Sequence, residues 1–300
     1  MQKLIIDTDP GEDIDDLLAL LFALRRPELD IRAITTVTLP AARRVRLVKR
    51  LLRHLDRTDI PVAAGMDLPL RAMSETELRA QSDFSRTLNH YAFAEPEDPR
   101  DEPGSLDAVD LIVRTVEANA GDIALACIGP LTNIACALRK NPGIASKIQY
   151  IAMMGGELAL NRIEHNVVFD YTAADIVLNS GIPVIMGTWD VTRRFVLSMD
   201  DVALFRRSVA PVCQALAAAV DLWHPVQNWK PGPVMYDLFP MVWAMDRSLY
   251  TTASMKVRVE TRGECTLGMT VARSDGVPVQ VTTGIQAAAV RELYLKTVLA

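Results

Sequence analysis

Acidic side chains are crowded near the start of the chain, and their spacing suggests metal chemistry. The stretch IIDTDPGEDIDDLLALL, residues 5–21, holds six carboxylates within ten residues: Asp7, Asp9, Glu12, Asp13, Asp15 and Asp16. Like charges this close repel one another unless a cation neutralises them. Capping of a helix N-terminus accounts for one or two of them, whereas a calcium ion takes roughly six to eight oxygen ligands. The cluster therefore favours a divalent-metal site over capping and solvation alone.

The elements predicted around this cluster place it at an edge of a sheet where ligands bind. Short apolar runs typical of buried strands alternate with segments of helical spacing. Strands are predicted over residues 3–7, 31–37, 60–65, 122–129, 148–156 and 182–190, and helices over 15–26, 41–55, 106–119, 131–141 and 172–181. This alternation predicts a single-domain α/β fold with an open, mostly parallel sheet and helices on both faces. The first strand then ends at Asp7 and Asp9 and the first helix opens at Asp15, at the carboxyl edge of the sheet.

The remaining segments complete one domain. Residues 71–105 are polar and end in a proline-rich run, which would suit an irregular insertion or lid near the mouth of the site. Residues 255–281 indicate a late β-hairpin, and residues 283–300 indicate a closing helix. No linker rich in proline or glycine divides the chain, so we expect a single domain over residues 1–300.

Composition narrows the classes of partner. The net charge of −5 gives no reason to expect nucleic-acid binding, and the basic stretch at 43–55 is interpreted as the solvated face of a surface helix. No apolar run approaches the ~20 residues that span a bilayer, and the N-terminus does not resemble a signal peptide. The four cysteines, Cys127, Cys136, Cys213 and Cys265, form no CxxC pair. Free buried thiols in a cytoplasmic protein are therefore expected.

Several short motifs occur along the chain in a recognisable order. They are DTDPGEDIDD at 7–16, IGPLTN at 128–133, IAMMGG at 151–156, IEHN at 163–166, DYTAA at 170–174, TWDVT at 188–192 and MYDLFP at 235–240. These resemble the DxDPGxDD, GPLTN, MGG, EFN, DPEAA, LDVT and HDPLA segments of the nucleoside hydrolase family, of the inosine-uridine-preferring type. The resemblance covers essentially the whole chain, and it implies that family's Rossmann-like fold.

The resemblance also implies roles for individual residues. It implies a Ca²⁺ ion held by Asp9, Asp16, the backbone carbonyl of Thr132, and Asp237. It implies that Glu164 and Asn166 bind the ribose hydroxyls. Because the first motif holds two extra residues, either Asp13 or Asp15 would take a further ribose-binding and catalytic place. The position of Asp15 at the helix start favours Asp15.

The chemistry of N-glycosidic cleavage suits these residue types. The reaction passes through an oxocarbenium-like sugar and needs an activated water. A metal lowers the pKa of water, and a neighbouring carboxylate accepts the proton, so Asp9 is the candidate general base. Carboxylate and amide groups at Glu164 and Asn166 suit a diol.

The groups that would recognise and protonate the base depart from the family pattern. Leu39-Pro40 stands where the family commonly has an asparagine, Tyr236 replaces a histidine, and no HGxxGL segment is recognisable. His224 is the candidate leaving-group acid, and Tyr236 is a weaker substitute with a reference pKa near 10. Ordinary packing is the alternative for His224. By alternation, His165 is expected to point away from its neighbours Glu164 and Asn166.

These observations predict a Ca²⁺-dependent ribonucleoside hydrolase that releases ribose and a free base. A small-molecule nucleoside is then the partner, with no nucleic acid or membrane, and a homo-oligomer, dimer or tetramer, is expected. A relative that binds nucleosides or ribose without turnover is one alternative. A metal-dependent phosphohydrolase of the haloacid-dehalogenase type is the other, because it also places DxD after a first strand. That class gives no role to the IEHN motif.

Overall fold

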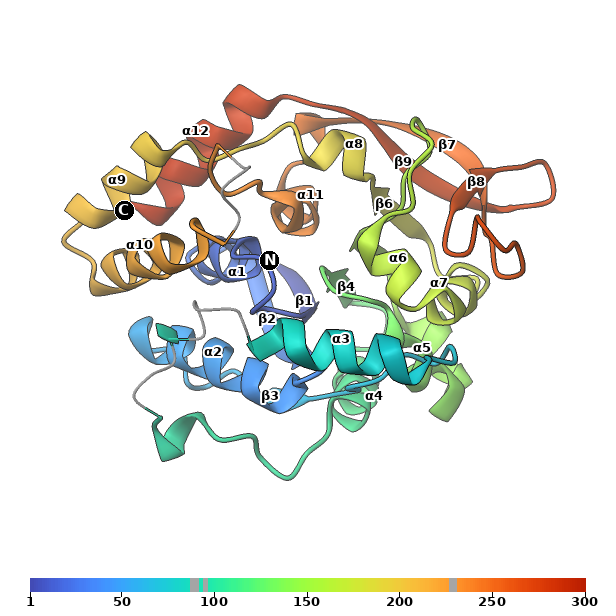
Figure 1. The fold of residues 1–300 in the computed structure, drawn as a ribbon, viewed down its shortest axis with the longest axis horizontal. Helices are drawn as coiled ribbons and strands as arrows, with labels where there is room; N and C mark the ends of the chain where they lie inside the picture. Colours follow the sequence, from blue (N-terminus) through green and yellow to red (C-terminus); the bar gives the residue numbers. More distant parts are fainter. Residues whose placement is uncertain (87–91, 94–96, 227–230) are drawn as a thin grey trace.

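The apolar runs of the sequence form the strands of one central sheet. A computed structural model describes residues 1–86, 92–93, 97–226 and 231–300 (Figure 1). The strands in these residues are β1 (Gln2–Thr8), β2 (Leu29–Thr36), β3 (Val62–Ala64), β4 (Ala124–Cys127), β5 (Ile151–Met154), β6 (Val184–Gly187), β7 (Tyr250–Val259), β8 (Thr270–Ala272) and β9 (Val277–Ile285). Their order across the sheet is β3-β2-β1-β4-β5-β6-β9-β7-β8.

The strand order creates a place for a ligand at β1. Strands β1 to β6 are all parallel, and β1 pairs with β2 on one side and β4 on the other. The chain therefore builds the sheet outward in one direction from β1 to β3, and in the other direction from β4 to β6. Ligands in such sheets bind beyond the carboxyl ends of the strands, at the point where the order reverses. That point lies between the ends of β1 and β4.

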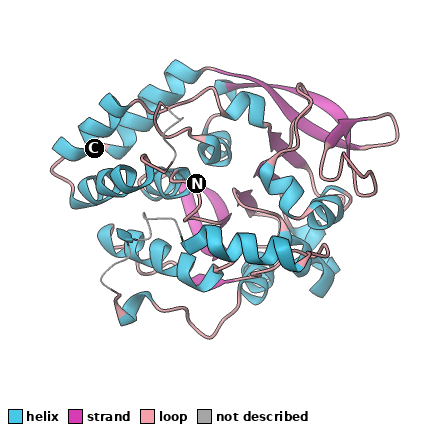
Figure 2. Cartoon of the chain, in the orientation of Figure 1, coloured by secondary structure: helices cyan, strands magenta, loops and turns pink. Residues whose placement is uncertain are grey.

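Helices cover both faces of the sheet, as the sequence predicts (Figure 2). Leu4 and Ile6 of β1 belong to one apolar core, whereas Ile5 belongs to the other, because successive strand side chains point to opposite faces. The first core is packed by α1 (Asp15–Leu24), α2 (Ala41–His54), α10 (Pro211–Trp223), α11 (Phe239–Met245) and α12 (Ala287–Val298). The second is packed by α4 (Ala108–Ala118), α5 (Thr132–Lys140) and α7 (Tyr171–Leu178).

Further helices and turns complete the described fold. They are α3 (Glu75–Arg86), α6 (His165–Phe169), α8 (Trp189–Thr192), α9 (Met199–Arg207), and the 3-10 turns η2 (Pro99–Asp101), η3 (Pro142–Lys147), η4 (Tyr236–Leu238) and η5 (Arg247–Leu249). In the part of the chain that the structure describes, none of the helices is long and apolar enough to cross a membrane. The four cysteines are free, with Cys127 and Cys213 buried and Cys265 exposed.

Two regions differ from the sequence-based expectation. The late hairpin is part of the main sheet, because β9 pairs in parallel with β6 while β7 runs antiparallel to β9. The stretch at 71–105, expected to be irregular, contains the helix α3 and the turn η2, although part of this expected lid lies outside the described residues. Asp101 of η2 is buried and accepts from Arg53 of α2, which fixes that turn to the body of the protein.

Candidate active site

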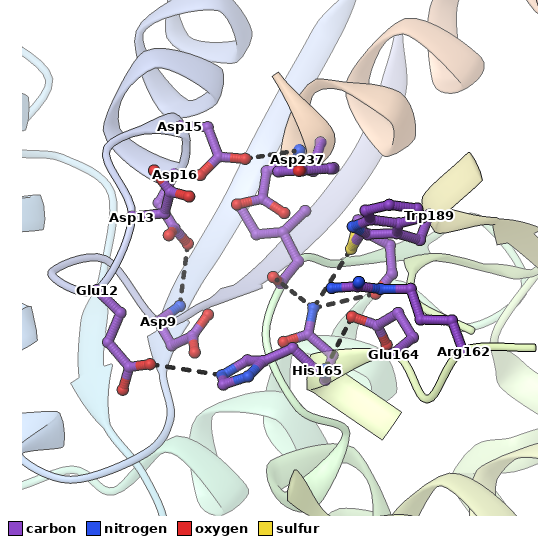
Figure 3. A pocket seen from close by; sticks show the side chains of 14 residues that line it. Asp9, Glu12, Asp13, Asp15, Asp16, Arg162, Glu164, His165, Trp189 and Asp237 are labelled. Atoms are coloured by element: carbon purple, nitrogen blue, oxygen red, sulfur yellow. Dashed lines mark hydrogen bonds and ion pairs between the residues drawn. The ribbon is translucent and has the colours of Figure 1, made fainter. Parts of the chain in front are cut away.

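The acidic loop after β1 opens onto a cavity of about 280 Å³ at the carboxyl end of the sheet. Figure 3 shows its walls, with the acidic loop on one side and α6 on the other. The described residues that line it are Asp9, Glu12, Asp13, Asp15, Asp16, Ile128, Met154, Arg162, Glu164, His165, Asn166, Trp189, Tyr236 and Asp237. The cavity thus collects residues from six separate segments of the chain, and most of the residues expected to form a site are among them.

Three buried carboxylates form a compact group in this cavity. Oxygens of Asp15, Asp16 and Asp237 all lie within 4.8 Å of one another. The backbone N–H of Asp237 donates to Asp15 at 3.3 Å, and Asp16 accepts from the Thr8 hydroxyl at 2.6 Å. Asp16 also accepts from the backbone N–H of Asp9 at 3.1 Å. The first of these contacts joins the acidic loop to a segment 222 residues away in the chain.

The electrostatics of this carboxylate group fit a divalent cation. Burial, followed by the charges of neighbouring aspartates, raises the pKa of Asp16 and of Asp237 well above the ordinary value. Several buried carboxylates are costly unless a cation pairs with them. Hard oxygen donors of this kind are the preferred ligands of Ca²⁺ and Mg²⁺. The donor set is therefore suited to a divalent metal.

Asp9 lies in the same cavity but outside that group of three carboxylates. Its carboxylate is buried and accepts from the Thr38 hydroxyl at 3.5 Å. Burial raises the pKa of Asp9 to about 7, even though the Arg44 charge opposes the rise. The loop after β4 packs directly against Asp9, since a Cβ atom added to Gly129 would lie 2.8 Å from Oδ1 of Asp9.

Asp7, the first aspartate of the acidic run, holds the sheet and α5 together instead of lining the cavity. Its Oδ1 atom accepts from the Thr35 hydroxyl at 2.5 Å and from the Asn133 amide at 2.8 Å. Asn133 also donates to the carbonyl of Thr36 and accepts from the backbone of Met66. The asparagine of the PLTN motif therefore ties the start of α5 to β1 and β2.

Arg44 holds the acidic loop after β1 in place through hydrogen bonds. Its guanidinium donates to the carbonyls of Asp9 and Pro10, to those of Thr38 and Leu39, and to the Glu12 carboxylate at 2.8 Å. The Arg44 side chain is completely buried. The expectation that the basic stretch forms only a solvated face is therefore wrong at this residue. Charged residues are buried when every donor has a partner, and the loops supply those partners.

The opposite wall of the cavity is the start of α6. Glu164 caps this helix, and its carboxylate accepts from the backbone N–H groups of Gly156, Asn166 and Val167 at 2.9 to 3.0 Å. The Asn166 amide nitrogen donates to the carbonyls of Ile128 and Met154, each at 3.2 Å. Both side chains are thereby fixed in orientation before any ligand arrives. The expectation that Glu164 and Asn166 share one site agrees with this placement.

Two of the expected site residues do not line the cavity. Thr132 is the first residue of α5, and its hydroxyl donates to Asp170 at 2.8 Å. The residue of that segment that does line the cavity is Ile128. His224 lies at the C-cap of α10 and is half-buried. Tyr236 does line the cavity, but burial and then the charges of Asp15 and Asp13 raise its pKa to about 12.

Three residues of the cavity wall, His165, Arg162 and Trp189, make contacts that the sequence did not indicate. His165 was expected to point away, but it opens a helix, where strand alternation does not apply, and its Nε2 atom lies 3.4 Å from Glu12. The hydrogen bond to Glu12 raises the pKa of His165 to about 9. Arg162 lies over the Trp189 ring at 3.9 Å, and Arg193 lies 4.3 Å from the same ring. The closeness of Arg162 to Glu164 in the sequence was the one indication that Arg162 would lie at the site.

The chain resembles known proteins along nearly its whole length. Residues 4–292 match the family described as inosine-uridine preferring nucleoside hydrolase. The pyrimidine-specific ribonucleoside hydrolase RihA of Escherichia coli O9:H4 (strain HS) is 36% identical over 278 residues, which are 89% of this chain and 87% of that relative. RihA of Shigella flexneri serotype 5b has the same identity and coverage.

Solved structures show the same fold. The plant nucleoside hydrolase PpNRh1 superposes with a TM-score of 0.85 and 27% identity, covering 100% of this chain and 99% of that one. The purine-preferring ribonucleoside hydrolase from Gardnerella vaginalis also has a TM-score of 0.85 and 27% identity, covering 99% and 98% of the two chains.

Proposed function

Because this chain belongs to the inosine-uridine preferring nucleoside hydrolase family and hydrolyses ribonucleosides, we propose that it does so with a Ca²⁺ ion held by its acidic cluster. The observation that carries the proposal is the group of three buried carboxylates, Asp15, Asp16 and Asp237, within 4.8 Å of one another. When bound, the cation supplies a Lewis acid that lowers the pKa of water and offsets the buried negative charge.

The proposed ligand set differs in two places from the one that the sequence resemblance implies. Asp16 and Asp237 remain ligands. Asp15 is added as a ligand because its carboxylate lies within 4.8 Å of theirs. The carbonyl of Ile128 replaces that of Thr132, because Ile128 lines the cavity whereas Thr132 does not. Asp9 lines the same cavity and remains a ligand in the proposal.

Ribose binding and proton transfer are assigned to other side chains of the cavity. Glu164 and Asn166 hold ribose hydroxyls from one wall, and Asp13 and Asp15 face them from the acidic loop. Asp9 accepts a proton from the attacking water, which adds to C1′ as the bond to the base nitrogen breaks. Water is thus consumed, and the products are ribose and the free base.

The relatives guide the choice of substrates. RihA is named as pyrimidine-specific, whereas the Gardnerella vaginalis enzyme is named as purine-preferring. The RihA relative is the more similar in sequence, at 36% against 27% identity. Pyrimidine ribonucleosides are therefore the substrates that we propose first, with inosine as the purine comparison.

The test measures ribose and free base released from uridine and inosine by metal-stripped and Ca²⁺-restored protein. We expect activity to disappear on chelation and to return with Ca²⁺. Asp9→Asn should abolish turnover in Ca²⁺, whereas Asp221→Asn, at an exposed ion pair with Arg206, is the matched control and should leave turnover intact. Full activity after complete metal removal would contradict the role of the cation.

A further inference from the structure

The proposed reaction needs a proton for the departing base. When the C1′–N bond breaks, its electron pair stays on the base, which is a poor leaving group as an anion. A positioned acid that protonates the base during bond breaking typically contributes ~10²–10⁴-fold to the rate. Such an acid has to reach the cavity, so the residues that line the cavity are the ones to consider.

His165 has the most suitable chemistry among the described residues that line the cavity. The lining carboxylates other than Glu12, which pairs with His165, are assigned to the cation, the ribose and the water. Arg162 does not give up its proton at accessible pH, and the phenol of Tyr236 is a weak acid near neutrality. His165 is the one histidine among the described lining residues. The other described histidines, His54 and His224, lie on α2 and at the end of α10, outside that lining.

The contacts of His165 hold the ring as a charged donor. Its Nε2 atom lies 3.4 Å from Oε2 of Glu12, and the Oε1 atom of Glu12 lies 2.8 Å from the buried Arg44 guanidinium. A carboxylate bonded to one ring nitrogen orients the imidazole and stabilises its protonated form, leaving the other N–H for a ligand. Figure 3 shows the Glu12 and His165 side chains meeting across the cavity from the acidic loop and α6.

The position of His165 also connects it to the sugar. It lies between Glu164 and Asn166, the two residues proposed to hold the ribose. Its side chain is 68% exposed although it belongs to the cavity wall, so a ligand can reach it. The acidic groups that act on its charge are Glu12, Glu164 and Asp9, and they raise its pKa to about 9. These contacts favour the protonated form of the ring.

We propose that His165 is the catalytic acid that protonates the nucleobase as it leaves, with Glu12 as the residue that positions it. This inference rests on the proposed hydrolase function. As the C1′–N bond breaks, the Nδ1–H of His165 gives its proton to an acceptor atom of the base. Water adds hydroxide to C1′ and its other proton passes to Asp9. Return of that proton through solvent to His165 completes the cycle, so that nucleoside and water become ribose and neutral base.

The test compares two leaving groups on the same ribose. Uridine needs protonation of its base, whereas p-nitrophenyl β-ribofuranoside releases a stable nitrophenolate without it. For His165→Gln we expect kcat on uridine to fall ~10²–10⁴-fold, with kcat on the nitrophenyl riboside within a few fold of the unaltered protein. His54→Gln, on α2, is the matched control and should change neither rate. Thermal unfolding checks that each variant is folded.

The outcomes separate this proposal from the one on which it rests. Equal losses on both substrates, or no loss on uridine, would overturn the acid role of His165 while leaving the hydrolase function intact. Failure of the unaltered, Ca²⁺-loaded protein to release ribose from any ribonucleoside would instead overturn the proposed function itself.

A second variant tests the link to Glu12. Glu12→Gln removes the carboxylate that raises the pKa of His165. The alkaline limb of the pH profile for uridine, expected near pH 9 in the unaltered protein, should then move to lower pH. The profile for the nitrophenyl riboside should not show this shift. An alkaline limb for uridine that stays in place would overturn the positioning role of Glu12.

Discussion

The guanidinium of Arg44 donates to the Glu12 carboxylate across 2.8 Å, and Arg44 is completely buried while Glu12 faces the cavity. The same guanidinium bonds carbonyls in the loop after β1 and in the loop after β2. A single side chain therefore fixes both loops at the edge of the sheet where the acidic cluster lies. Its partners include the backbone of Asp9, so its position bears directly on the proposed base.

Removal of Arg44 should destabilise the protein and disturb the site together. Arg44→Met leaves several buried carbonyls and the Glu12 carboxylate without their donor, and we expect a loss of about 3–5 kcal/mol in the free energy of unfolding. Urea denaturation measures this loss. Arg46→Met, two residues along the same helix at partly exposed ion pairs, is the control and should cost about 0–1 kcal/mol. A loss below about 1 kcal/mol for Arg44→Met would contradict the bracing role.

Binding of the proposed cation should appear in stability as well as in activity. A ligand present at ~100 times its Kd stabilises the folded state by about 2.7 kcal/mol. Thermal unfolding of metal-stripped protein should therefore shift to higher temperature on addition of Ca²⁺. Asp237→Asn should reduce this shift, because Asp237 is one of the three clustered carboxylates. An identical unfolding temperature with and without Ca²⁺ would count against a cation at this cluster.

The central fold could be predicted from the sequence because its signals are local. Alternation at Leu4, Ile5 and Ile6 and the short apolar runs reflect strands buried on both faces, and these strands form the centre of the sheet. The pairing of β9 with β6 was not foreseen, since it joins residues distant in the chain. A hairpin pattern gives the direction of its own strands but not the strand against which the hairpin packs.

The motif resemblance brought the right side chains into one cavity. Asp16, Asp237, Glu164 and Asn166, which the resemblance placed in a common site, all line it. A backbone carbonyl can act as a ligand whatever the residue type, so the sequence alone could not show that Ile128 lines the cavity and Thr132 does not.

Buried or paired charges are also hard to predict, because their partners come from other segments. The sequence alone indicates that Arg44 belongs to a basic surface helix, because it does not show the two loops whose carbonyls surround the guanidinium. The sequence alone suggests that His165 points away from the site, because it does not show that Glu12 lies opposite it.

Ribose recognition should make 2′-deoxynucleosides poorer substrates. The Asn166 amide nitrogen is already held by the carbonyls of Ile128 and Met154, which leaves its oxygen to accept from a hydroxyl. A substrate that lacks the 2′-hydroxyl leaves a polar group of the site unpaired, at about 1–3 kcal/mol. We expect kcat/KM for 2′-deoxyuridine to lie roughly 10- to 100-fold below that for uridine. Equal values for the two substrates would remove Glu164 and Asn166 from the ribose-binding role.

The close approach of Gly129 to Asp9 gives a sharper test of the proposed base. An added Cβ would lie 2.8 Å from Oδ1 of Asp9 and 2.8 Å from a methyl group of Val37, so one of them has to move. Overpacking of this kind costs about 1–3 kcal/mol, and Gly129→Ala should lower kcat on uridine by roughly tenfold or more, because small misplacements of catalytic groups are costly. Gly104→Ala is the control, since no atom lies within 4 Å of its added Cβ. Unchanged kcat in Gly129→Ala would argue against Asp9 as the base.

Acid stability should depend on the pair Asp201 and Arg291, which joins α9 to α12. Asp201 is buried, and although burial alone raises its pKa, the Arg291 side chain and the Ser198 cap lower it below the ordinary value. A carboxyl with a lowered folded-state pKa adds stability above its unfolded value near 4, and that stability is lost as the pH falls through the folded pKa. Arg291→Met should therefore cost about 1–2 kcal/mol at pH 7, and the difference from the unaltered protein should shrink below about pH 4. Arg273→Met, which breaks an exposed pair with Asp275, should show almost no such pH dependence in urea denaturation at a series of pH values.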